Sequence, residues 1–277
     1  MDKYYVLSDG FKIPKIGFGT VGFKGNDGAR RIQMALNSGY RLLDSAFNYE
    51  NEATVGHAIR TSGIPRDQIT FTSKLPGRYH EYNLAMGNIQ ESLLRSGLDY
   101  MDLYLIHWPN PIEDKYLEAW QALIDAQKAG LIRSIGVSNF LPEHINRLEE
   151  ETGVLPVINQ IELHPYFNQA EQREFHKEKE IITQAWSPLG RDNAALDEKV
   201  ITEIANKYKK SNGQIILRWE VQSGILPIPK SSHALRQKDN IDIYDFELTD
   251  EELDLINRLS RKDGRNNDQD PAVYQEF

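Results

Sequence analysis

The stretch Asp102-Leu103-Tyr104-Leu105-Ile106-His107 is a short, mostly apolar run that ends in a histidine. A run of this length with little polar alternation is typical of a strand buried on both faces of a parallel sheet. Seven further short apolar runs occur along the chain, at residues 16–20, 41–46, 70–75, 134–139, 157–163, 181–187 and 225–229. Segments with helical periodicity separate them, for example 83–96 and 116–129. Eight strand–helix units in one chain predict a (β/α)8 barrel.

The two ends of the chain depart from this repeat. Residues 4–13 predict a β-hairpin around Ser8-Asp9-Gly10. The interval after the seventh run is long enough for two helices, at 197–208 and 214–222, and a last helix is expected to begin at Thr249, with Glu252 completing a capping box. The predicted fold is therefore an α/β TIM barrel with an N-terminal β-hairpin and two extra helices. We expect a single domain over residues 1–277, with a tail at 264–277.

Composition narrows the classes of function. The chain has 277 residues, no cysteine and a formal net charge of −9. Disulfides and thiolate chemistry are excluded, and the negative charge disfavours nucleic acid or an anionic membrane as a partner. No signal peptide or membrane span is expected, so the predicted location is the cytoplasm. We expect no metal site and a small-molecule substrate.

Polar residues stand where the predicted strands end. Asp44, Lys74 and His107 end strands two, three and four, and Ser138-Asn139 ends strand five. Others lie in or after the remaining strands, namely Gln160, Glu162, His164, Ser187 and Lys230. The carboxyl ends of parallel barrel strands open into one mouth, where barrel enzymes carry their active sites. The pattern therefore predicts a catalytic mouth.

Tyr49, Lys74 and Asp44 form the most informative set in that mouth. A free tyrosine titrates near pH ~10, and a lysine ammonium beside it is expected to lower that pKa. Asp44 would keep Lys74 charged, and Tyr49 would act as a general acid. His107 could orient a carbonyl oxygen. None of these groups supplies an electron pair to a carbonyl, so a hydride-donating cofactor is required. Taken singly, each also has a structural interpretation: Asp44 and Lys74 as an ion pair, His107 as a histidine at the barrel rim, and Tyr49 as a packed aromatic.

Several motifs, in a fixed order, resemble the aldo-keto reductase family over residues 5–260. They are Gly39-Tyr40-Arg41-Leu42-Leu43-Asp44-Ser45-Ala46-Phe47-Asn48-Tyr49-Glu50-Asn51-Glu52, Val55-Gly56, Thr72-Ser73-Lys74-Leu75, Asp102 to Pro109, Ile135-Gly136-Val137-Ser138-Asn139-Phe140, Asn159-Gln160-Ile161-Glu162, Ser187-Pro188-Leu189-Gly190 and Ile228-Pro229-Lys230-Ser231. The short connection after His107 resembles the bacterial 2,5-diketo-D-gluconate reductase and glyoxal reductase branch.

The resemblance implies an NADPH-dependent oxidoreductase that reduces aldehydes and ketones, among them keto-sugars, 2-oxoaldehydes and keto esters. It implies that Tyr49 donates the proton, that Lys74 and Asp44 lower its pKa, and that His107 positions the carbonyl. Members with short loops are commonly monomers, so a monomer is expected. Two alternatives remain open: a non-enzymatic nucleotide-sensing protein on the same fold, and a lyase that uses Lys74 as a Schiff base.

The resemblance also implies where NADPH or NADP+ binds. The residues expected to contact it are Gly19, Thr20, Val21, Asp44, Ser138, Asn139, Gln160, Trp186, Ser187, Leu189, Gly190, Lys230, Ser231, Ser232, Arg236 and Asn240. Lys230, Ser231 and Arg236 are assigned to the adenosine 2′-phosphate, which favours NADP over NAD. Trp186 stands where many members have a tyrosine stacked on the nicotinamide. A substrate entrance is expected from Phe23, Phe47, His107 and Trp108. Whether the tail covers the mouth is left open.

Overall fold

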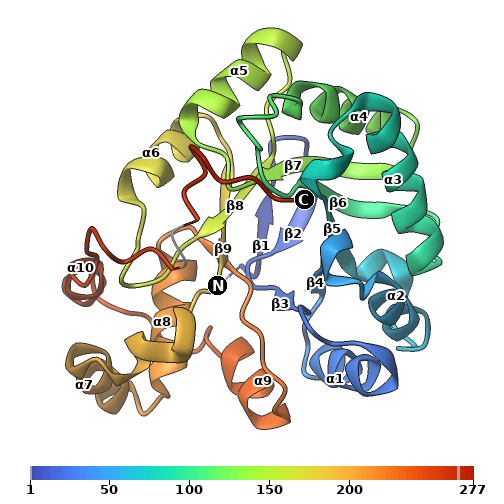
Figure 1. The fold of residues 1–277 in the computed structure, drawn as a ribbon. Coiled ribbons are helices and arrows are strands. Elements are labelled where there is room, and N and C mark those ends of the chain that lie inside the picture. The colour runs from blue at the N-terminus through green and yellow to red at the C-terminus, as the bar shows by residue number, and fades with distance from the viewer. Residues whose placement is uncertain (1, 267–268) are drawn as a thin grey trace.

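The computed structural model describes residues 2–266 and 269–277, and in that part of the chain eight parallel strands form one curled sheet surrounded by helices (Figure 1). Along the chain the strands are β3 (Phe18–Gly19), β4 (Leu42–Asp44), β5 (Thr70–Leu75), β6 (Met101–Ile106), β7 (Ile132–Ser138), β8 (Ile158–Glu162), β9 (Ile182–Trp186) and β10 (Leu226–Pro227). Each strand pairs with the next one in sequence, as in a (β/α)8 barrel. The predicted fold class is confirmed.

Two prolines shape the seam between the first and last strands. The amides of Gly17 and Gly19 donate hydrogen bonds to the carbonyl oxygens of Pro227 and Pro229, over 2.9 and 3.1 Å. These bonds close the barrel. Proline has no N–H group, so neither proline donates a hydrogen bond back to the glycine strand, and the glycine amides are the donors in this pairing. For this reason β3 and β10 are shorter than the predicted runs 16–20 and 225–229.

Helices cover the outside of the barrel. They are α1 (Gly25–Asn37), α2 (Glu52–Arg60), α3 (Tyr82–Ser96), α4 (Tyr116–Lys128), α5 (Pro142–Thr152), α6 (Ala170–Glu178), α7 (Lys199–Tyr208), α8 (Asn212–Gln222), α9 (Ala234–Ile241) and α10 (Asp250–Asn257). Two successive helices, α7 and α8, follow β9, and two more, α9 and α10, follow β10, which accounts for the two predicted extra helices. Thr249 caps α10 and forms the predicted capping box with Glu252.

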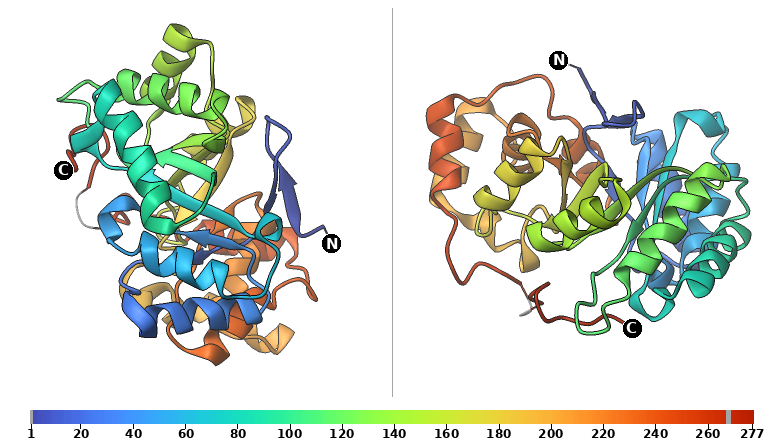
Figure 2. Two further views of the ribbon diagram at one scale, coloured as in Figure 1. Left: turned by 90° about the vertical axis from the view of Figure 1, so that its right-hand side faces the viewer. Right: turned by 90° about the horizontal axis from the view of Figure 1, so that it is seen from above.

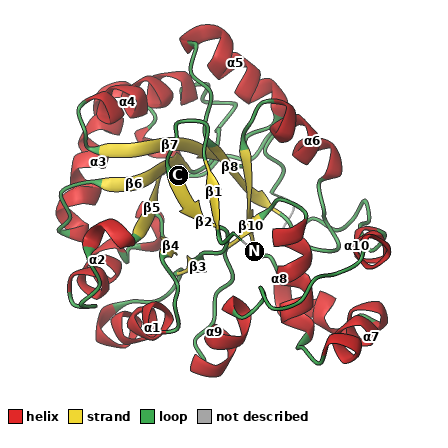
Figure 3. Cartoon of the chain, turned by 180° about the vertical axis from the view of Figure 1, so that it is seen from behind, coloured by secondary structure: helices red, strands yellow, loops and turns green. Residues whose placement is uncertain are grey.

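The predicted hairpin is present as β1 (Tyr4–Val6) and β2 (Lys12–Pro14). It lies across one end of the barrel, in front of the strands when the molecule is seen from behind (Figure 3). Leu7 and Ile13 pack against side chains from inside the barrel such as Leu103 and Leu226. The hairpin therefore plugs the end at which the strands begin and leaves the opposite end open.

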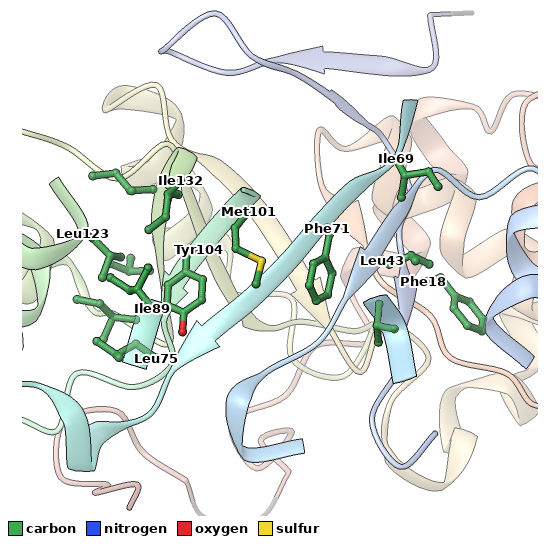
Figure 4. Packing of buried hydrophobic residues seen from close by; sticks show 14 of the residues in the cluster. Phe18, Leu43, Ile69, Phe71, Leu75, Ile89, Met101, Tyr104, Leu123 and Ile132 are labelled. Carbon is green, nitrogen blue, oxygen red and sulfur yellow. The ribbon is translucent and has the colours of Figure 1, made fainter. Parts of the chain in front are cut away.

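The larger apolar core lies between the sheet and its helices. Ile89 of α3 and Leu123 of α4 pack against Met101, Tyr104 and Ile132 of the strands (Figure 4). These side chains are almost entirely shielded from water. Burial of this kind contributes roughly 1.5–3 kcal/mol per large side chain, so the core holds the strand ends in fixed positions.

Candidate active site

The open end of the barrel brings Asp44, Tyr49, Lys74 and His107 together. Asp44 ends β4, Lys74 lies in β5 and His107 directly follows β6. Tyr49 follows β4 on a short 3-10 helix, Phe47–Tyr49, which turns the chain back over the mouth. The rings of Tyr49 and His107 meet edge to face, with centroids 5.9 Å apart. The arrangement predicted from the strand ends is present in the structure.

Lys74 is anchored on three sides. Its ammonium lies 2.7 Å from Asp44 Oδ1 and donates a second hydrogen bond, also 2.7 Å, to the carbonyl oxygen of Ser45. It stands 5.1 Å from the ring centroid of Tyr49. The side chains of Lys74 and Asp44 are almost wholly buried. A buried ion pair of this kind holds its geometry because separating the charges would leave each one uncompensated.

The protonation of Tyr49 and Lys74 follows from burial and from their contact. Burial has the largest effect on the pKa of Tyr49 and raises it, although the residue is only half-buried and lines the pocket. Lys74 lowers that pKa through its charge and a hydrogen bond, and the net pKa lies above the usual value. Burial also acts to lower the pKa of Lys74, but Asp44 and Tyr49 outweigh it and raise that pKa. The pair is therefore a neutral phenol beside an ammonium.

This result corrects one prediction. The sequence predicted a net lowering of the Tyr49 pKa from the ammonium of Lys74, whereas burial of the phenol, which the sequence does not reveal, raises the pKa by more. Lys74 lowers the Tyr49 pKa, as expected, but by less than burial raises it. The phenol is thus held in its proton-donating form.

A pocket of about 420 Å³ opens beside these residues. Its lining includes the predicted positions Gly19, Thr20, Val21, Asp44, Tyr49, His107, Trp108, Ser138, Asn139, Gln160, Trp186, Ser187 and Lys230. Asn139 and Ser187 have positive φ values of 62° and 52°. Such backbone is costly for residues other than glycine and is concentrated at functional sites.

A polar network lines the floor of the pocket. Trp186 donates its indole hydrogen to Asn139 Oδ1 over 2.8 Å, and Asn139 donates to the carbonyl oxygen of His107 over 3.0 Å. Gln160 donates to Asp44 Oδ2 over 2.7 Å. The Thr20 hydroxyl is fully buried and donates to the carbonyl oxygen of Asp44 over 2.8 Å. The network fixes the side chains that the sequence assigns to a nicotinamide.

The predicted phosphate-binding residues lie farther out, beyond β9 and β10. Leu189, Gly190, Ser231, Ser232, Arg236 and Asn240 do not line the pocket. Lys230 lies over the ring of Phe23, with Nζ 5.0 Å from the centroid. The pKa of Lys230 is lowered by burial and by the nearby charge of Arg31. Asp27 pairs with Arg31 over 2.7 Å, whereas no ion pair to Lys230 is found among the described side chains, so the ammonium of Lys230 is available to an anion at this edge of the mouth.

Arg31 was missed by the sequence reasoning. It comes from α1, far from the Ile-Pro-Lys-Ser motif, and donates a hydrogen bond of 3.2 Å to the carbonyl oxygen of Ser232. Its only signal in the sequence is an unremarkable arginine on an amphipathic helix. The contact depends on barrel closure, which places α1 beside α9.

Two predicted substrate residues do not line the pocket. Phe23 packs against Phe18, with ring centroids 6.0 Å apart, beneath Lys230. Phe47 packs against Tyr79, with centroids 5.5 Å apart, and the guanidinium of Arg95 lies over its ring. Both side chains are buried. The predicted entrance residues Trp108 and His107 line the pocket, whereas Phe23 and Phe47 are not part of its lining, and their role in substrate binding stays a prediction.

Residues from the far end of the chain complete the pocket. Gln269, Tyr274 and Glu276 line it beside Tyr49 and His107. The rings of Tyr274 and Trp108 have centroids 4.4 Å apart. Figure 2 shows the end of the chain at the opposite end of the barrel from the hairpin. The sequence left open whether the tail covers the mouth. In the structure, residues 269–277 cover part of it.

Comparison with known proteins points to one family. The model of the "Aldo/keto reductase family" matches residues 15–261. The chain is 48% identical to 2,5-diketo-D-gluconic acid reductase B of Corynebacterium sp., covering 98% of this chain and 97% of that one. It is 41% identical to glyoxal reductase of Bacillus subtilis, covering 92% of each. A solved variant of Gox0644 in complex with NADPH superimposes with a TM-score of 0.94 at 36% identity and 99% coverage of both chains.

Proposed function

Because the chain belongs to the aldo/keto reductase family, we propose that it reduces aldehydes and ketones to alcohols with NADPH, and that Tyr49 donates the proton. The observation that carries the proposal is the neutral phenol of Tyr49 beside the buried Lys74–Asp44 pair. A protonated group within reach of a bound carbonyl contributes roughly 10²–10⁴ in rate as a general acid. Membership of this family makes the chain an oxidoreductase, whichever carbonyl compound it reduces.

Each residue of the set has a distinct role in this proposal. Tyr49 gives its proton to the carbonyl oxygen as the alcohol forms. Lys74 stabilises the phenolate that remains, because its ammonium is fixed beside the ring. Asp44 keeps Lys74 charged and in place. His107 contacts the ring of Tyr49 edge to face and orients the carbonyl oxygen beside the two rings.

The residues of the mouth fit a nicotinamide dinucleotide phosphate. Asn139, Ser138 and Gln160 present amides and a hydroxyl at the pocket floor, and Trp186 offers a partly exposed ring face for stacking. Lys230 and Arg31 supply positive charge at the outer edge. When bound, NADPH supplies the hydride that no side chain can provide. Arg236 and Ser231, on the same side of the barrel, are assigned to the 2′-phosphate.

The names of the relatives support small, oxygen-rich carbonyl compounds as substrates, in particular keto-sugars and 2-oxoaldehydes, with keto esters as a further class. We also propose a monomeric enzyme of the cytoplasm that binds no nucleic acid, on the basis of the net charge of −9 and the family resemblance. In the described part of the chain, no helix combines the length and the apolar character that a bilayer crossing requires.

A Schiff-base lyase is disfavoured by the state of Lys74. A nucleophilic lysine must lose its proton, whereas Asp44 and Tyr49 raise the pKa of Lys74. Borohydride treatment with substrate should therefore yield no covalent adduct. A nucleotide-sensing protein without catalysis is disfavoured because the proton donor and its partners are all present.

The test is an NADPH-consumption assay over methylglyoxal, aromatic aldehydes, keto-sugars and keto esters, with the wild type and Tyr49→Phe. We expect reduction by the wild type and a loss of at least about 100-fold in the variant, from the size of general acid catalysis. Binding of NADPH, followed by fluorescence, should persist in the variant. Retained reduction by Tyr49→Phe would refute the assigned acid, and binding without reduction by the wild type would favour a sensor.

A further inference from the structure

The two ring nitrogens of His107 have different surroundings. Nδ1 is shielded from water and lies 2.7 Å from Glu276 Oε1, and apart from this carboxylate it has no polar partner among the described atoms. Nε2 makes no hydrogen bond within residues 2–266 and 269–277, and the residue lines the pocket. The carboxylate therefore holds one nitrogen, while the other is left to meet a substrate.

Glu276 is itself held in a fixed orientation toward His107. Asn48 donates a hydrogen bond of 2.7 Å to the same oxygen, Oε1, and Arg78 donates one of 2.7 Å to Asn48 Oδ1. Asn48 directly precedes Tyr49 on the 3-10 helix of the mouth. One oxygen of Glu276 therefore joins the helix that carries the proton donor to the residue assigned to the carbonyl oxygen.

The main chain around Glu276 is docked by contacts that do not involve its carboxylate. Asn110 donates a hydrogen bond of 2.7 Å to the Glu276 carbonyl oxygen and accepts one of 3.0 Å from its amide. A Cβ at Gly77 would collide with that carbonyl oxygen, so the segment fits against bare backbone. The ring of Tyr274 packs on Trp108. A change confined to the carboxylate should therefore leave the segment in place.

The docked carboxylate of Glu276 is ionised. Burial has the largest effect on its pKa and raises it, but the charge of His107 and the contacts with His107 and Asn48 together outweigh burial and lower that pKa. Glu276 is therefore a carboxylate at neutral pH, with its charge directed at Nδ1.

The other titratable groups at this end of the pocket offer no further counter-charge. Tyr49 keeps its proton because its pKa is raised, and Asp44 is already paired with Lys74 over 2.7 Å. His80, which also interacts with the docked carboxylate, is neutral because burial lowers its pKa to about 4. Among the described side chains, the docked carboxylate is therefore the one placed to balance a charge on His107.

A proton on Nδ1 decides what Nε2 can do. A neutral histidine that is protonated on Nδ1 presents only a lone pair at Nε2, and a lone pair cannot donate to a carbonyl oxygen. Both nitrogens donate only in the imidazolium form. That form is positively charged, and a carboxylate 2.7 Å away stabilises it.

We propose that Glu276 is a positioning residue, which keeps a proton on Nδ1 of His107 and stabilises the imidazolium that donates from Nε2 to the substrate carbonyl oxygen. This inference rests on the proposed reductase function. A charge-assisted hydrogen bond is roughly twice as strong as a neutral one, so the imidazolium orients and polarises the carbonyl more strongly. Because the imidazolium is lost as pH rises, Glu276 extends carbonyl reduction to higher pH.

The experiment compares the wild type, Glu276→Gln and Glu113→Gln in the reduction of methylglyoxal by NADPH, from about pH 6 to about pH 9, a range that spans the ordinary titration of histidine. Glutamine keeps the size of the side chain and an acceptor oxygen while removing the charge. Glu113 is exposed and does not line the pocket, so its variant controls for a change in surface charge. Thermal midpoints of the three proteins check that each is folded.

A second measurement does not depend on activity. Nitrogen NMR of isotope-labelled protein follows the two ring nitrogens of His107, with His107→Gln used to assign their signals. We expect the wild type to carry a proton on Nδ1 across the whole range, and its imidazolium to persist to higher pH than in Glu276→Gln.

In the kinetic assay, we expect kcat/KM to fall as pH rises, and to fall at lower pH in Glu276→Gln than in the wild type and Glu113→Gln. In the upper part of the range Glu276→Gln should be about tenfold below the wild type, the difference between a charge-assisted and a neutral hydrogen bond. The KM for NADPH should be unchanged, because a merely local structural disturbance of the mouth, unlike the loss of a charge, would alter it as well.

The same pH profile and the same His107 titration in the wild type and Glu276→Gln would overturn the proposal and leave the reductase function intact. A wild-type ring whose proton lies on Nε2 and not on Nδ1 at neutral pH would also overturn it. If the wild type reduces no carbonyl compound, the proposed function itself fails, whereas the NMR titration still decides whether Glu276 holds the proton on Nδ1.

Discussion

The side-chain amide of Gln160 donates a hydrogen bond to Asp44 Oδ2 over 2.7 Å, while Lys74 binds Oδ1 of the same carboxylate at the same distance. Both oxygens of Asp44 are thereby used as acceptors. One carboxylate fixes the ammonium beside Tyr49 and also an amide at the pocket floor. The proton-donating side of the mouth and the side assigned to the cofactor are therefore mechanically joined through Asp44.

Asp44→Asn should uncouple the two sides. An asparagine is neutral and can present an oxygen to only one of the two donors, so the buried Lys74 loses its counter-charge. We expect kcat for carbonyl reduction to fall by about 100-fold or more, in line with loss of general acid catalysis. Breaking a buried ion pair should also lower the free energy of unfolding by about 3–5 kcal/mol. Steady-state kinetics and urea denaturation measure the two effects, and Asp99→Asn, at an exposed site, is the control. Wild-type kcat in Asp44→Asn would show that Lys74 needs no counter-ion.

Arg236→Ala should weaken NADPH and spare NADH. A guanidinium bound to the 2′-phosphate contributes a charge-assisted hydrogen bond, so its loss should raise the KM for NADPH by about 10-fold or more. NADH lacks that phosphate and should be nearly unaffected. Lys238→Ala removes a cation from the same helix, α9, at a position that lines a different pocket, and serves as the matched control. Equal changes for both cofactors would show that Arg236 does not bind the 2′-phosphate.

Acid should destabilise the fold partly through His176. Asn159 and Gln172 each donate a hydrogen bond of 3.0 Å to its Nε2, and Nδ1 contacts Thr183 at 2.8 Å, so the ring is held neutral. Burial lowers the pKa of His176 to about 3. Below the ordinary value of 6.5 the unfolded chain takes up a proton that the folded ring refuses. Stability is therefore complete above that value and is lost as pH falls, by about 1.4 kcal/mol per pH unit.

Urea denaturation of the wild type and His176→Gln at pH 7 and about pH 4.5 measures this contribution. The wild type should lose about 3 kcal/mol more than the variant between the two conditions, a value that follows from the slope per pH unit. His57→Gln, at an exposed position on α2, should follow the wild type. Parallel losses in the wild type and His176→Gln would contradict a neutral His176.

The sequence predicted the barrel and the meeting of Asp44, Tyr49, Lys74 and His107 for one physical reason. Parallel strands place their carboxyl ends at one edge, so a polar residue after a buried run is located as soon as the run is recognised. The net pKa of Tyr49 could not be predicted in this way, because it depends on how completely the phenol is desolvated.

The parts that were missed are contacts between segments far apart in the chain. Glu276 reaches His107 only because Asn110 and Gly77 provide a docking surface, and no periodic pattern marks that surface in the sequence. Arg31 reaches Ser232 only after the barrel closes. Phe23 and Phe47 were assigned to the substrate entrance by analogy, and in the structure each packs on an aromatic neighbour outside the pocket lining.

The seam between β3 and β10, across which glycine amides donate to proline carbonyls, has a mechanical consequence. Gly19 stands on one side of it and Lys230 on the other, and a Cβ at Gly19 would lie 3.5 Å from the Lys230 side chain. The two edges are joined by bonds that only glycine amides donate. A dinucleotide bound beside Gly19 and Lys230 would bridge this seam and hold its two edges together. Amide hydrogen exchange at Gly17 and Gly19 should therefore be slower with NADPH bound than without it.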